Sequence, residues 1–355
     1  MKIGYLTDTH FTYNLSAPGV EKYLRESYDF IFEVFKSNGV ERIIHGGDLI
    51  NTRKFVEVKE LDFMMKIFIE RLVENGYHMD MIPGNHDVYY RNTNRLNFID
   101  FIADRFKGYI KIHHTPNIVK IDNQKFMMVP WLNSENQEMC LNFIKENVSD
   151  DIIVIGHFDL VGFVMHKGSI SRRGLTADVF KGYQEVWSGH YHSRSTQGNI
   201  RYMGASTQFN FNDSDEDRGC YIYDTETKQL SFHSIPTNFF TTKTIRGKLL
   251  SSDEISSLEG KNVRLYVKDR GEDLYQYDRM VDSIKEISAT FNVILQLDGV
   301  VSGEDSGDLL EESIMTTRDL VIRYMKNIPV LPEDVSREEL LEFLLGLYDQ
   351  EISAG

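Results

Sequence analysis

The feature that most limits the possible folds is a recurring unit: an apolar run, then a glycine, then polar residues able to bind metal. The clearest example is Ile82-Pro83-Gly84-Asn85-His86-Asp87, where the apolar run that begins at Met79 stops at a Pro-Gly turn. A buried strand that ends in a tight turn with Asn, His and Asp suits a site at the edge of a sheet. Taken alone, the segment fits an ordinary surface turn equally well.

Four other apolar runs end in the same way, which favours a shared site over a set of surface turns. They lead into Asp8-Thr9-His10, Gly46-Gly47-Asp48, Gly156-His157 and Gly189-His190-Tyr191-His192. Adjacent parallel strands align their carboxyl ends, so we expect these residues to converge on one crevice. The glycines beside them allow backbone and metal to approach closely.

Strand-like runs alternate with amphipathic helical patterns as far as about residue 235. The helical patterns cover residues 22–35, 58–73, 96–106 and 138–144. The strand-like runs cover residues 2–6, 42–44, 79–82, 110–112, 118–121, 126–129, 152–155, 185–187, 200–203, 220–223 and 230–232. This order predicts an α/β domain with two sheets, an early one connected by helices and a later, more meander-like one.

The character of the chain changes after about residue 236. Patterns at 263–267, 274–287 and 293–297 predict a small β-α-β unit, and the polar, glycine-containing segment 301–308 predicts a linker. Two helices should follow, the first with Leu310, Ile314, Val321 and Met325 on one face, the second capped by Ser336 with Glu339 three residues on. We therefore expect four parts, which are residues 1–235, 236–300, 301–308 and 309–355.

Charge and cysteine content limit the class of protein less than the motifs do. The net charge is −15, of which residues 301–355 carry −9, so the first 300 residues carry only −6. Bound divalent cations would offset much of that remainder, so the charge neither excludes a DNA substrate nor indicates one. The two cysteines, Cys140 and Cys220, form no CxxC pair, which argues against a disulfide scaffold or a thiolate zinc site. We expect a cytoplasmic protein with no signal peptide and no membrane span.

The donor types at the strand ends indicate which metals are suitable. Carboxylate, amide oxygen and imidazole without thiolate suit Mn²⁺, Fe²⁺, Zn²⁺ or Mg²⁺ more than a structural zinc ion. The number of donors fits two ions, which a carboxylate such as Asp48 can bridge at roughly 3.5–4 Å. A water between two such ions would lose a proton near neutral pH and could attack an anionic phosphoester. His190 and His192 are alternate residues, and an extended segment projects both imidazoles to one side.

The motifs D-x-H, G-D, G-N-H-D/E, G-H and G-H-x-H, in this order, resemble those of the calcineurin-like metallophosphoesterase superfamily. Gly47-Asp48-Leu49 followed by Arg53, Val129-Pro130-Trp131, and Trp187-Ser188-Gly189-His190 resemble one branch within it. That branch is the nuclease subunit of the double-strand-break repair complex, with the SbcD-type exonuclease and the phage recombination endonuclease subunit as similar members. The resemblance covers essentially the whole chain. It implies a two-sheet α/β/β/α sandwich with a small β-α-β capping domain and a two-helix C-terminal tail.

The resemblance also implies a role for each motif residue. Two ion sites are implied, with ligands Asp8, His10, Asp48 and His192 for the first and Asp48, Asn85, His157 and His190 for the second. His86 would be no ligand and would protonate the leaving 3′ oxygen or stabilise charge on the phosphate. Asp87 would stand behind the ligands and orient a histidine. Many nuclease subunits carry a histidine where this chain has Asn51, so a phosphate contact from that side chain is not expected.

Residues outside the motifs have plainer expectations. Six histidines should be structural or exposed, namely His45, His78, His113, His114, His166 and His233. Arg172 and Arg173 are the candidate contacts to a phosphate backbone, and the alternative for them is a solvated charge pair on a surface loop.

The expected function is a metal-dependent DNA nuclease, exonuclease or endonuclease, acting in recombination and double-strand-break repair by two-metal hydroxide attack on phosphodiesters. Mn²⁺ is the expected ion and Mg²⁺ the alternative. The resemblance implies that residues 236–300 guide DNA, that the acidic tail helices dock on the coiled-coil base of an SMC-like ATPase subunit, and that the nuclease subunit forms a homodimer. The chain has no G-x-x-x-x-G-K-[ST] loop, so ATP hydrolysis would belong to that partner.

Two other functions remain open at this point. A small-molecule phosphodiesterase or a phosphoprotein phosphatase would share the metal site, although neither needs an acidic two-helix tail. A non-catalytic scaffold could keep the fold, but such proteins usually lose ligands, and here all seven expected ligands are present.

Overall fold

The computed structural model describes residues 1–295 except 12, 167, 168, 215 and 272, together with residues 322, 325 and 336–354. The chain divides into two compact units, the first made of residues 1–242, 251–264 and 281–292 and the second of residues 243–250, 265–280 and 293–355. The predicted linker at 301–308 and the tail positions Leu310, Ile314 and Val321 lie outside the described residues. In the part that the structure describes, no helix has the length and apolar character needed to cross a membrane.

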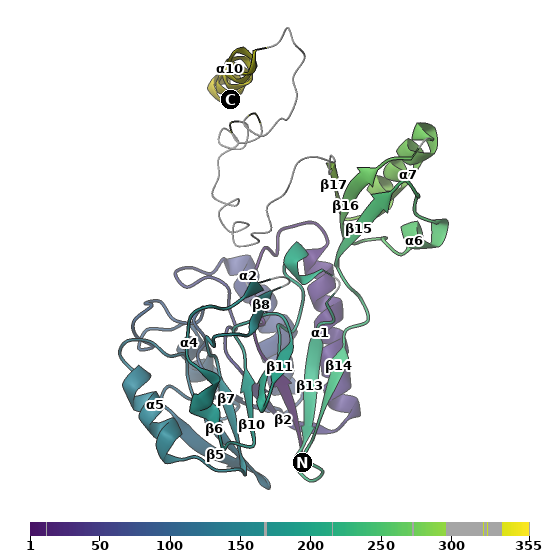
Figure 1. The fold of residues 1–355 in the computed structure, drawn as a ribbon. Helices are drawn as coiled ribbons and strands as arrows, with labels where there is room; N and C mark the ends of the chain where they lie inside the picture. Colours follow the sequence, from purple (N-terminus) through teal and green to yellow (C-terminus); the bar gives the residue numbers. More distant parts are fainter. Residues whose placement is uncertain are drawn as a thin grey trace. The chain divides into compact units, whose positions relative to one another are not determined.

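Two six-stranded sheets form the larger unit (Figure 1). The first sheet has the order β14 (Gln229–Ser234), β13 (Gly219–Asp224), β1 (Lys2–Leu6), β2 (Val40–His45), β3 (His78–Met81) and β4 (Ile110–Ile112). Its strands β1 to β4 are parallel, and the β13–β14 hairpin joins the edge of β1 in antiparallel pairing. The parallel strands end at one edge of the sheet, where three of the predicted motifs begin.

The second sheet is built around four parallel strands. Its order is β11 (Ser195–Gln197), β12 (Ile200–Tyr202), β10 (Glu185–Ser188), β7 (Ile152–Gly156), β6 (Gln124–Met128) and β5 (Asn117–Ile121). Strands β6, β7, β10 and β12 run parallel, and β5 and β11 pair antiparallel at the two edges. The other two predicted motifs follow β7 and β10.

The prediction of a late, meander-like sheet is wrong. The centre of the second sheet is parallel, and the two latest strands of the sandwich, β13 and β14, return to the first sheet. Parallel strands need a crossover, but the crossover between β7 and β10 contains only the short strands β8 (Val164–His166) and β9 (Ser169–Ile170) and a 3₁₀ turn at Ala177–Phe180. The segment between β7 and β10 lacks a helical pattern, but the two strands are parallel and the segment is an irregular crossover, not part of a meander.

The helices cover the outer faces of the two sheets. Helix α1 (Val20–Ser37) buries Tyr28, Ile31 and Phe35 and ends at Asn38-Gly39 as predicted, with Gly39 at a φ of 67°. The second predicted helix is continuous but has a π-helical segment, Met65–Ile69, between α2 (Val58–Met64) and α3 (Glu70–Glu74). These helices and α4 (Ile99–Arg105) pack on the first sheet, whereas α5 (Gln137–Glu146) packs on the second.

A third apolar layer lies between the two sheets. Trp187 of β10 is fully buried there and makes edge contacts with Tyr5 of β1 at 5.6 Å and Tyr223 of β13 at 5.2 Å between ring centroids. Ile44 and Phe126 belong to the same cluster. The inner faces of the sheets are therefore packed on each other and the outer faces on helices, which confirms the predicted α/β/β/α sandwich.

A separate three-stranded sheet contains β15 (Phe240–Arg246), β16 (Asn262–Asp269) and β17 (Thr290–Leu295), with α6 (Ser252–Ser256) and α7 (Leu274–Ile287) beside them in the sequence. The elements of the predicted β-α-β unit are present as β16, α7 and β17. Strand β15 was missed, because its threonine-rich sequence lacks a clear apolar alternation. The tail helix α10 (Arg337–Ala354) begins after Ser336, whose Oγ accepts the backbone N–H of Glu339 at 3.4 Å.

Candidate metal centre

The polar residues that follow β1, β2, β3, β7 and β10 lie together at the carboxyl ends of the two sheets. Potential ligand atoms of Asp8, His10 and His192 lie within 4.8 Å of one another, and so do those of Asp8, Asp48 and His157. The loops are joined through their backbones as well, since the N–H of Asp8 donates to the carbonyl of Gly47 at 3.0 Å and that of His10 to Asp48 at 3.1 Å. The crevice expected from the five motifs is therefore present.

The first predicted ligand set is brought together around His10. Its Nε2 lies 3.2 Å from Nε2 of His192, 3.7 Å from Oδ2 of Asp48 and 4.0 Å from Oδ1 of Asp8. The Nδ1 atom of His10 is buried and has no hydrogen-bond partner among the described residues. Two imidazole nitrogens and two carboxylates facing one point form a donor set that fits a divalent cation.

The second predicted set is brought together around Asn85. Its Oδ1 lies 3.0 Å from Nε2 of His157 and 2.9 Å from Nδ1 of His190. The Oδ2 atom of Asp48 lies 3.1 Å from the same Nε2 of His157. Asp48 therefore faces both sets, which is the position that a bridging ligand requires.

The loops hold several of these residues in left-handed backbone conformations. Asp8, His10, Asp48 and His190 have φ angles of 50°, 41°, 56° and 87°. Each such angle costs on the order of 1–2 kcal/mol for a residue other than glycine. Among the described residues other than glycine, four of the seven with positive φ are thus predicted ligands. The packing around the loops overcomes this strain, which is typical of functional sites.

Two glycines are required because ligands approach them closely. A Cβ atom on Gly84 would lie 2.2 Å from Oδ1 of Asp48, and one on Gly189 would lie 2.2 Å from Oγ1 of Thr7 and 2.7 Å from Oδ2 of Asp8. Any side chain at these positions would displace a carboxylate. The glycines of the motifs therefore set the width of the site.

Asp87 has a different role from the one expected. Its buried carboxylate accepts backbone N–H groups from Asp48, Leu49 and Gly84, each at 2.8 Å, and from Ile50 at 3.3 Å. The prediction that it orients a histidine is wrong, because its partners are the amides of two loops. Burial, and next the charge of Asp48, raise the pKa of Asp87 to about 6. The residue ties the loop after β2 to the loop after β3.

His86 lies beside the ligand sets and is held by the loop after β2. Its backbone N–H donates to Oδ1 of Asp48 at 2.7 Å, and its ring lies 4.9 Å from that of His10. Its Nδ1 lies 2.5 Å from the backbone carbonyl of Asn51. A carbonyl can only accept a hydrogen bond, so Nδ1 carries the proton and Nε2 is the unprotonated nitrogen of the neutral ring. Asn51 therefore contacts His86 through its backbone carbonyl, whereas the sequence motif concerned only its side chain.

The electrostatics favour the protonation states that metal binding needs at three imidazoles and at Asp48. Burial lowers the pKa of His190 and His192 to about 3 and that of His10 well below its usual value, so these imidazoles are neutral. Burial opposes ionisation of Asp48, but the charge and hydrogen bond of His157 outweigh it and hold the pKa of Asp48 well below the usual range. Neutral imidazole and ionised carboxylate are the forms that bind metal.

At two other predicted ligands the electrostatics do not favour these states. Burial opposes protonation of His157, but the charge of Asp48 outweighs burial and raises the pKa of His157 to about 9, so a metal ion has to displace a proton there. Burial raises the pKa of Asp8 to about 6.

Two further residues support the loops and carried no recognisable signal in the sequence. Nδ1 of the buried His45 accepts the N–H of Gly47 at 3.2 Å, so its Nε2–H donates to Oγ1 of Thr9 at 3.1 Å. The buried guanidinium of Arg218 donates to the carbonyl of His192 and pairs with Asp213 at 2.7 Å. Through these bonds His45 reaches Thr9, 36 positions away, and Arg218 reaches His192, 26 positions away.

The remaining candidates lie outside the ligand cluster. His113 pairs with Asp80 at 2.8 Å, His114 pairs with Asp100 at 2.7 Å, and His78 stacks on Tyr109. Arg172 and Arg173 are exposed on the loop after β9, and within the described chain neither contacts a predicted ligand. That loop is nevertheless attached near the site, since Ser171 donates to Asp159, two residues beyond His157.

Comparison with known proteins identifies the family of this chain. Residues 1–194, which include every predicted ligand, match the family model for calcineurin-like phosphoesterases. Exonuclease subunit 1 of Enterobacteria phage T4 is 28% identical over 348 residues, 98% of each chain, and the SbcD component of the nuclease SbcCD of Staphylococcus epidermidis is 26% identical over 265 residues, 65% of this chain and 67% of that one. A solved archaeal phosphodiesterase is 18% identical, with a TM-score of 0.35, over 66% of this chain and 99% of its own. The chain belongs to the calcineurin-like phosphoesterase family.

Proposed function

We propose that this protein is a metal-dependent DNA nuclease and the nuclease subunit of an SMC-like ATPase–nuclease complex in DNA recombination and double-strand-break repair. The observation that carries the proposal is the convergence of two ligand sets on Asp48, in a chain similar over 98% of its length to a phage exonuclease subunit. The family makes the chain a phosphoester hydrolase, and the relatives favour a DNA phosphodiester as the bond that it hydrolyses.

The proposed ion sites use the two sets described above. The first ion is held by Asp8, His10, Asp48 and His192, and the second by Asp48, Asn85, His157 and His190. Oxygen and nitrogen donors without thiolate favour Mn²⁺, with Mg²⁺ as the alternative. When bound, such ions neutralise charge on the phosphate and activate water for in-line attack.

His86 is the proposed proton donor to the leaving oxygen. The carbonyl of Asn51 accepts from Nδ1–H and occupies that nitrogen, so Nε2 is the nitrogen that would carry the proton for transfer. The carboxylate of Asp87 fixes the loops on both sides of this ring. Metal binding and proton donation thus belong to different side chains and should be separable by substitution.

The direct test is hydrolysis by the purified full-length protein in Mn²⁺ of a linear DNA duplex and, separately, of a phosphomonoester. We expect the duplex to be degraded, the monoester to turn over poorly, and EDTA to abolish both activities. Turnover of the monoester alone would favour a phosphatase instead. A scaffold role would gain if His86→Gln or Asp48→Ala left DNA processing by the complex unchanged.

The C-terminal tail is the proposed docking segment for the ATPase subunit, and residues 236–300 are proposed to guide DNA to the site. Helix α10 carries Glu338, Glu339 and Glu342 beside the exposed Phe343, a combination that suits docking on a partner helix. Phe343→Asp should weaken copurification with the ATPase subunit while DNA hydrolysis by the nuclease subunit alone stays unchanged. Such a complex would act on DNA in the cytoplasm.

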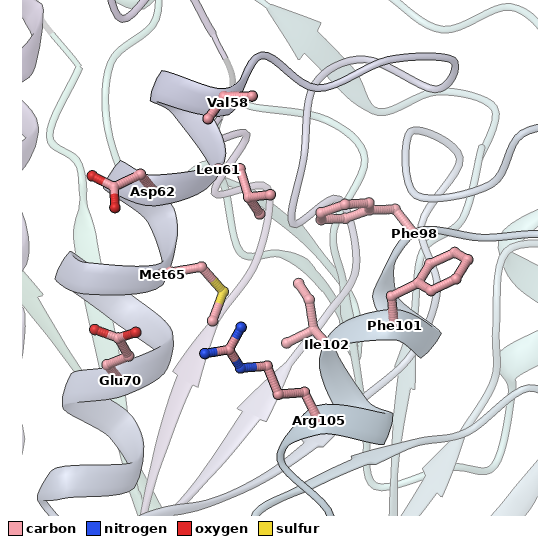
Figure 2. Close-up of a pocket in the computed structure, with 9 residues that line it drawn as sticks. All are labelled: Val58, Leu61, Asp62, Met65, Glu70, Phe98, Phe101, Ile102 and Arg105. Carbon is pink, nitrogen blue, oxygen red and sulfur yellow. The ribbon is translucent and has the colours of Figure 1, made fainter.

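An apolar groove between the α2–α3 helices and α4 is the proposed contact with a second copy of the chain. The groove has a volume of about 390 Å³, and Leu61, Met65 and Ile102 point into it from its two walls (Figure 2). At its rim, Val58 and Phe101 are 83% and 68% exposed. One wall also carries acidic residues and the other carries Arg105, so two copies related by a two-fold axis could pair opposite charges.

Light scattering on the purified protein tests this contact. We expect a dimer for the natural chain and for the tail variant Phe343→Asp, and a monomer for Leu61→Asp combined with Phe101→Glu. A dimer that survives the groove substitutions would place the contact elsewhere.

A further inference from the structure

The two tryptophans of the chain have opposite surroundings. Trp187 is fully buried between the sheets, and its indole N–H donates to Glu185 at 2.7 Å. Trp131 is only partly buried, and its indole N–H has no hydrogen-bond partner in the described part of the chain. Burial explains Trp187, whereas the core does not require a ring as large as Trp131 at this position.

Trp131 lies directly against the second ligand set. Its ring centroid is 5.2 Å from that of His190 and 6.0 Å from that of His157. Both imidazoles contact Asn85. A partly exposed aromatic ring is therefore placed beside the proposed second ion site.

Buried polar contacts fix the backbone of Trp131. Its N–H donates to the carbonyl of Pro83 at 2.9 Å, and its carbonyl accepts from the side-chain amides of Asn94 at 3.0 Å and Asn136 at 2.9 Å. Asn133 in turn donates to Oδ1 of Asn94 at 2.7 Å, and all three asparagines are buried. Buried amides are costly unless they are bonded, so this network specifies one position for the loop. The backbone that carries the indole ring is thus held in one position by these hydrogen bonds.

The same network holds a second loop that exposes aromatic and basic residues. Asn94 belongs to the segment after His86, which also carries Tyr89 and Tyr90, both exposed, with ring centroids 4.7 Å apart. Arg91 is exposed on the same segment. Exposed aromatic rings mixed with arginines beside a phosphate site are typical of surfaces that bind single-stranded nucleic acid by base stacking.

We propose that Trp131 forms a nucleobase-binding subsite, in which one unpaired base next to the scissile phosphate stacks on the indole ring. This inference rests on the proposed nuclease function and adds a preference to it. A base can stack on Trp131 only after it has left the duplex, so single-stranded or frayed DNA is the preferred substrate over a blunt, fully paired end. Tyr89 and Tyr90 would bind neighbouring bases of the same DNA strand.

Tryptophan fluorescence tests binding directly, because Trp187 is buried and only Trp131 can contact a ligand. The full-length protein, with Ca²⁺ in place of Mn²⁺ to prevent hydrolysis and quenching by the ion, is titrated with an oligothymidylate or an abasic oligonucleotide of equal length. We expect quenching by the oligothymidylate only, and no quenching in Trp131→Phe. Equal quenching by both ligands, or none while fluorescence anisotropy of a labelled oligothymidylate reports binding, would overturn the inference.

Kinetics with the same two oligonucleotides in Mn²⁺ distinguish base binding from mere support of the histidines. Stacking is worth roughly 1–3 kcal/mol per base, so Trp131→Ala should raise KM for the oligothymidylate about tenfold or more. It should change neither kcat nor the hydrolysis of the abasic strand, and Trp131→Phe should restore most of the affinity. Equal loss of kcat on both substrates would mean that Trp131 only supports His190. If the natural protein cleaves neither strand, the nuclease proposal fails, while the fluorescence titration still decides the subsite.

Discussion

The two sheets make different contributions to one site. The first sheet supplies both carboxylates and the amide, together with one imidazole, through Asp8, His10, Asp48 and Asn85. The second sheet supplies only imidazoles, through His157, His190 and His192. Carboxylates are thus concentrated at the end of one sheet, and the imidazoles that complete each proposed ligand set come from the other.

The two halves are also held by different means. The loops of the first sheet are tied to each other by the carboxylate of Asp87, whereas the last loop of the second sheet is held by Arg218 at its His192 carbonyl and by the N–H of His190, which donates to Asp8 at 3.0 Å. Neither sheet alone contains a complete ligand set. The site therefore depends on the packing of the two sheets on each other, to which the contact of Trp187 with Tyr5 contributes.

The largest expected effect comes from Asp48, the residue proposed to serve both ion sites. Asp48→Ala should remove both ions and lower DNA hydrolysis about a thousandfold or more, because several kcal/mol of charge stabilisation depend on the ions. His192→Ala, on the second sheet, should remove only one ion. Metal content by mass spectrometry and initial rates check both variants. Equal metal loss in the two variants would contradict the assignment of Asp48 to both sites.

The next effect separates chemistry from metal binding within one loop. His86→Ala should retain both ions and lose about 10²–10⁴-fold in rate, the usual contribution of a general acid. Asn85→Ala is the matched control and should lose one ion. Loss of an ion in His86→Ala would show that its ring is a ligand instead.

Two buried aspartates seven residues apart allow a test of what holds the first sheet. Asp87→Asn leaves at least two loop amides without an acceptor, so it should lower the free energy of unfolding by about 2 kcal/mol or more and weaken metal binding. Asp80, equally buried, pairs instead with Arg42 at 2.7 Å and His113 at 2.8 Å, away from the ligands. Asp80→Asn should also lower the free energy of unfolding but leave metal affinity unchanged. Thermal unfolding and metal titration measure both, and equal metal affinities in the two variants would refute the tying role of Asp87.

The smallest expected effect is a pH dependence of stability from Asp80. Burial opposes its ionisation, but the hydrogen bonds from His113 and Arg42 outweigh burial and lower its pKa. A lowered folded-state pKa stabilises the fold above the unfolded value of about 3.9 and loses that contribution as the pH falls through the folded value. As the pH falls below about 4, the free energy of unfolding should therefore decrease less in Asp80→Asn than in the natural chain. Parallel slopes of unfolding temperature against pH would contradict this linkage.

The sequence predicted which residues would lie together at the site better than it predicted the residues that support them. Each proposed ligand lies within four residues of the end of a strand and is therefore visible as part of a local motif, as at His157 after β7. The amides that Asp87 binds in the loop after β2 lie 37 to 39 positions away, and the carbonyl of His192 lies 26 positions from Arg218, so only the fold brings these partners together. The carbonyl of Asn51 could not be predicted either, since every residue has one and only the local backbone decides its direction.

The strand order shows the same limit. The strand-like run at Cys220–Tyr223 was correctly predicted, but its partner β1 begins at the other end of the domain. Apolar alternation specifies that a strand is half-buried, not which neighbour it pairs with. The β13–β14 hairpin was therefore placed in the wrong sheet.

The most direct test of the central claim, two ions that share Asp48, is anomalous diffraction from crystals of the full-length protein soaked in Mn²⁺. The account predicts two peaks roughly 3.5–4 Å apart with the carboxylate of Asp48 between them, one beside His10 and His192 and the other beside Asn85 and His190. A single peak, no peak, or a pair of peaks that Asp48 does not bridge would contradict it.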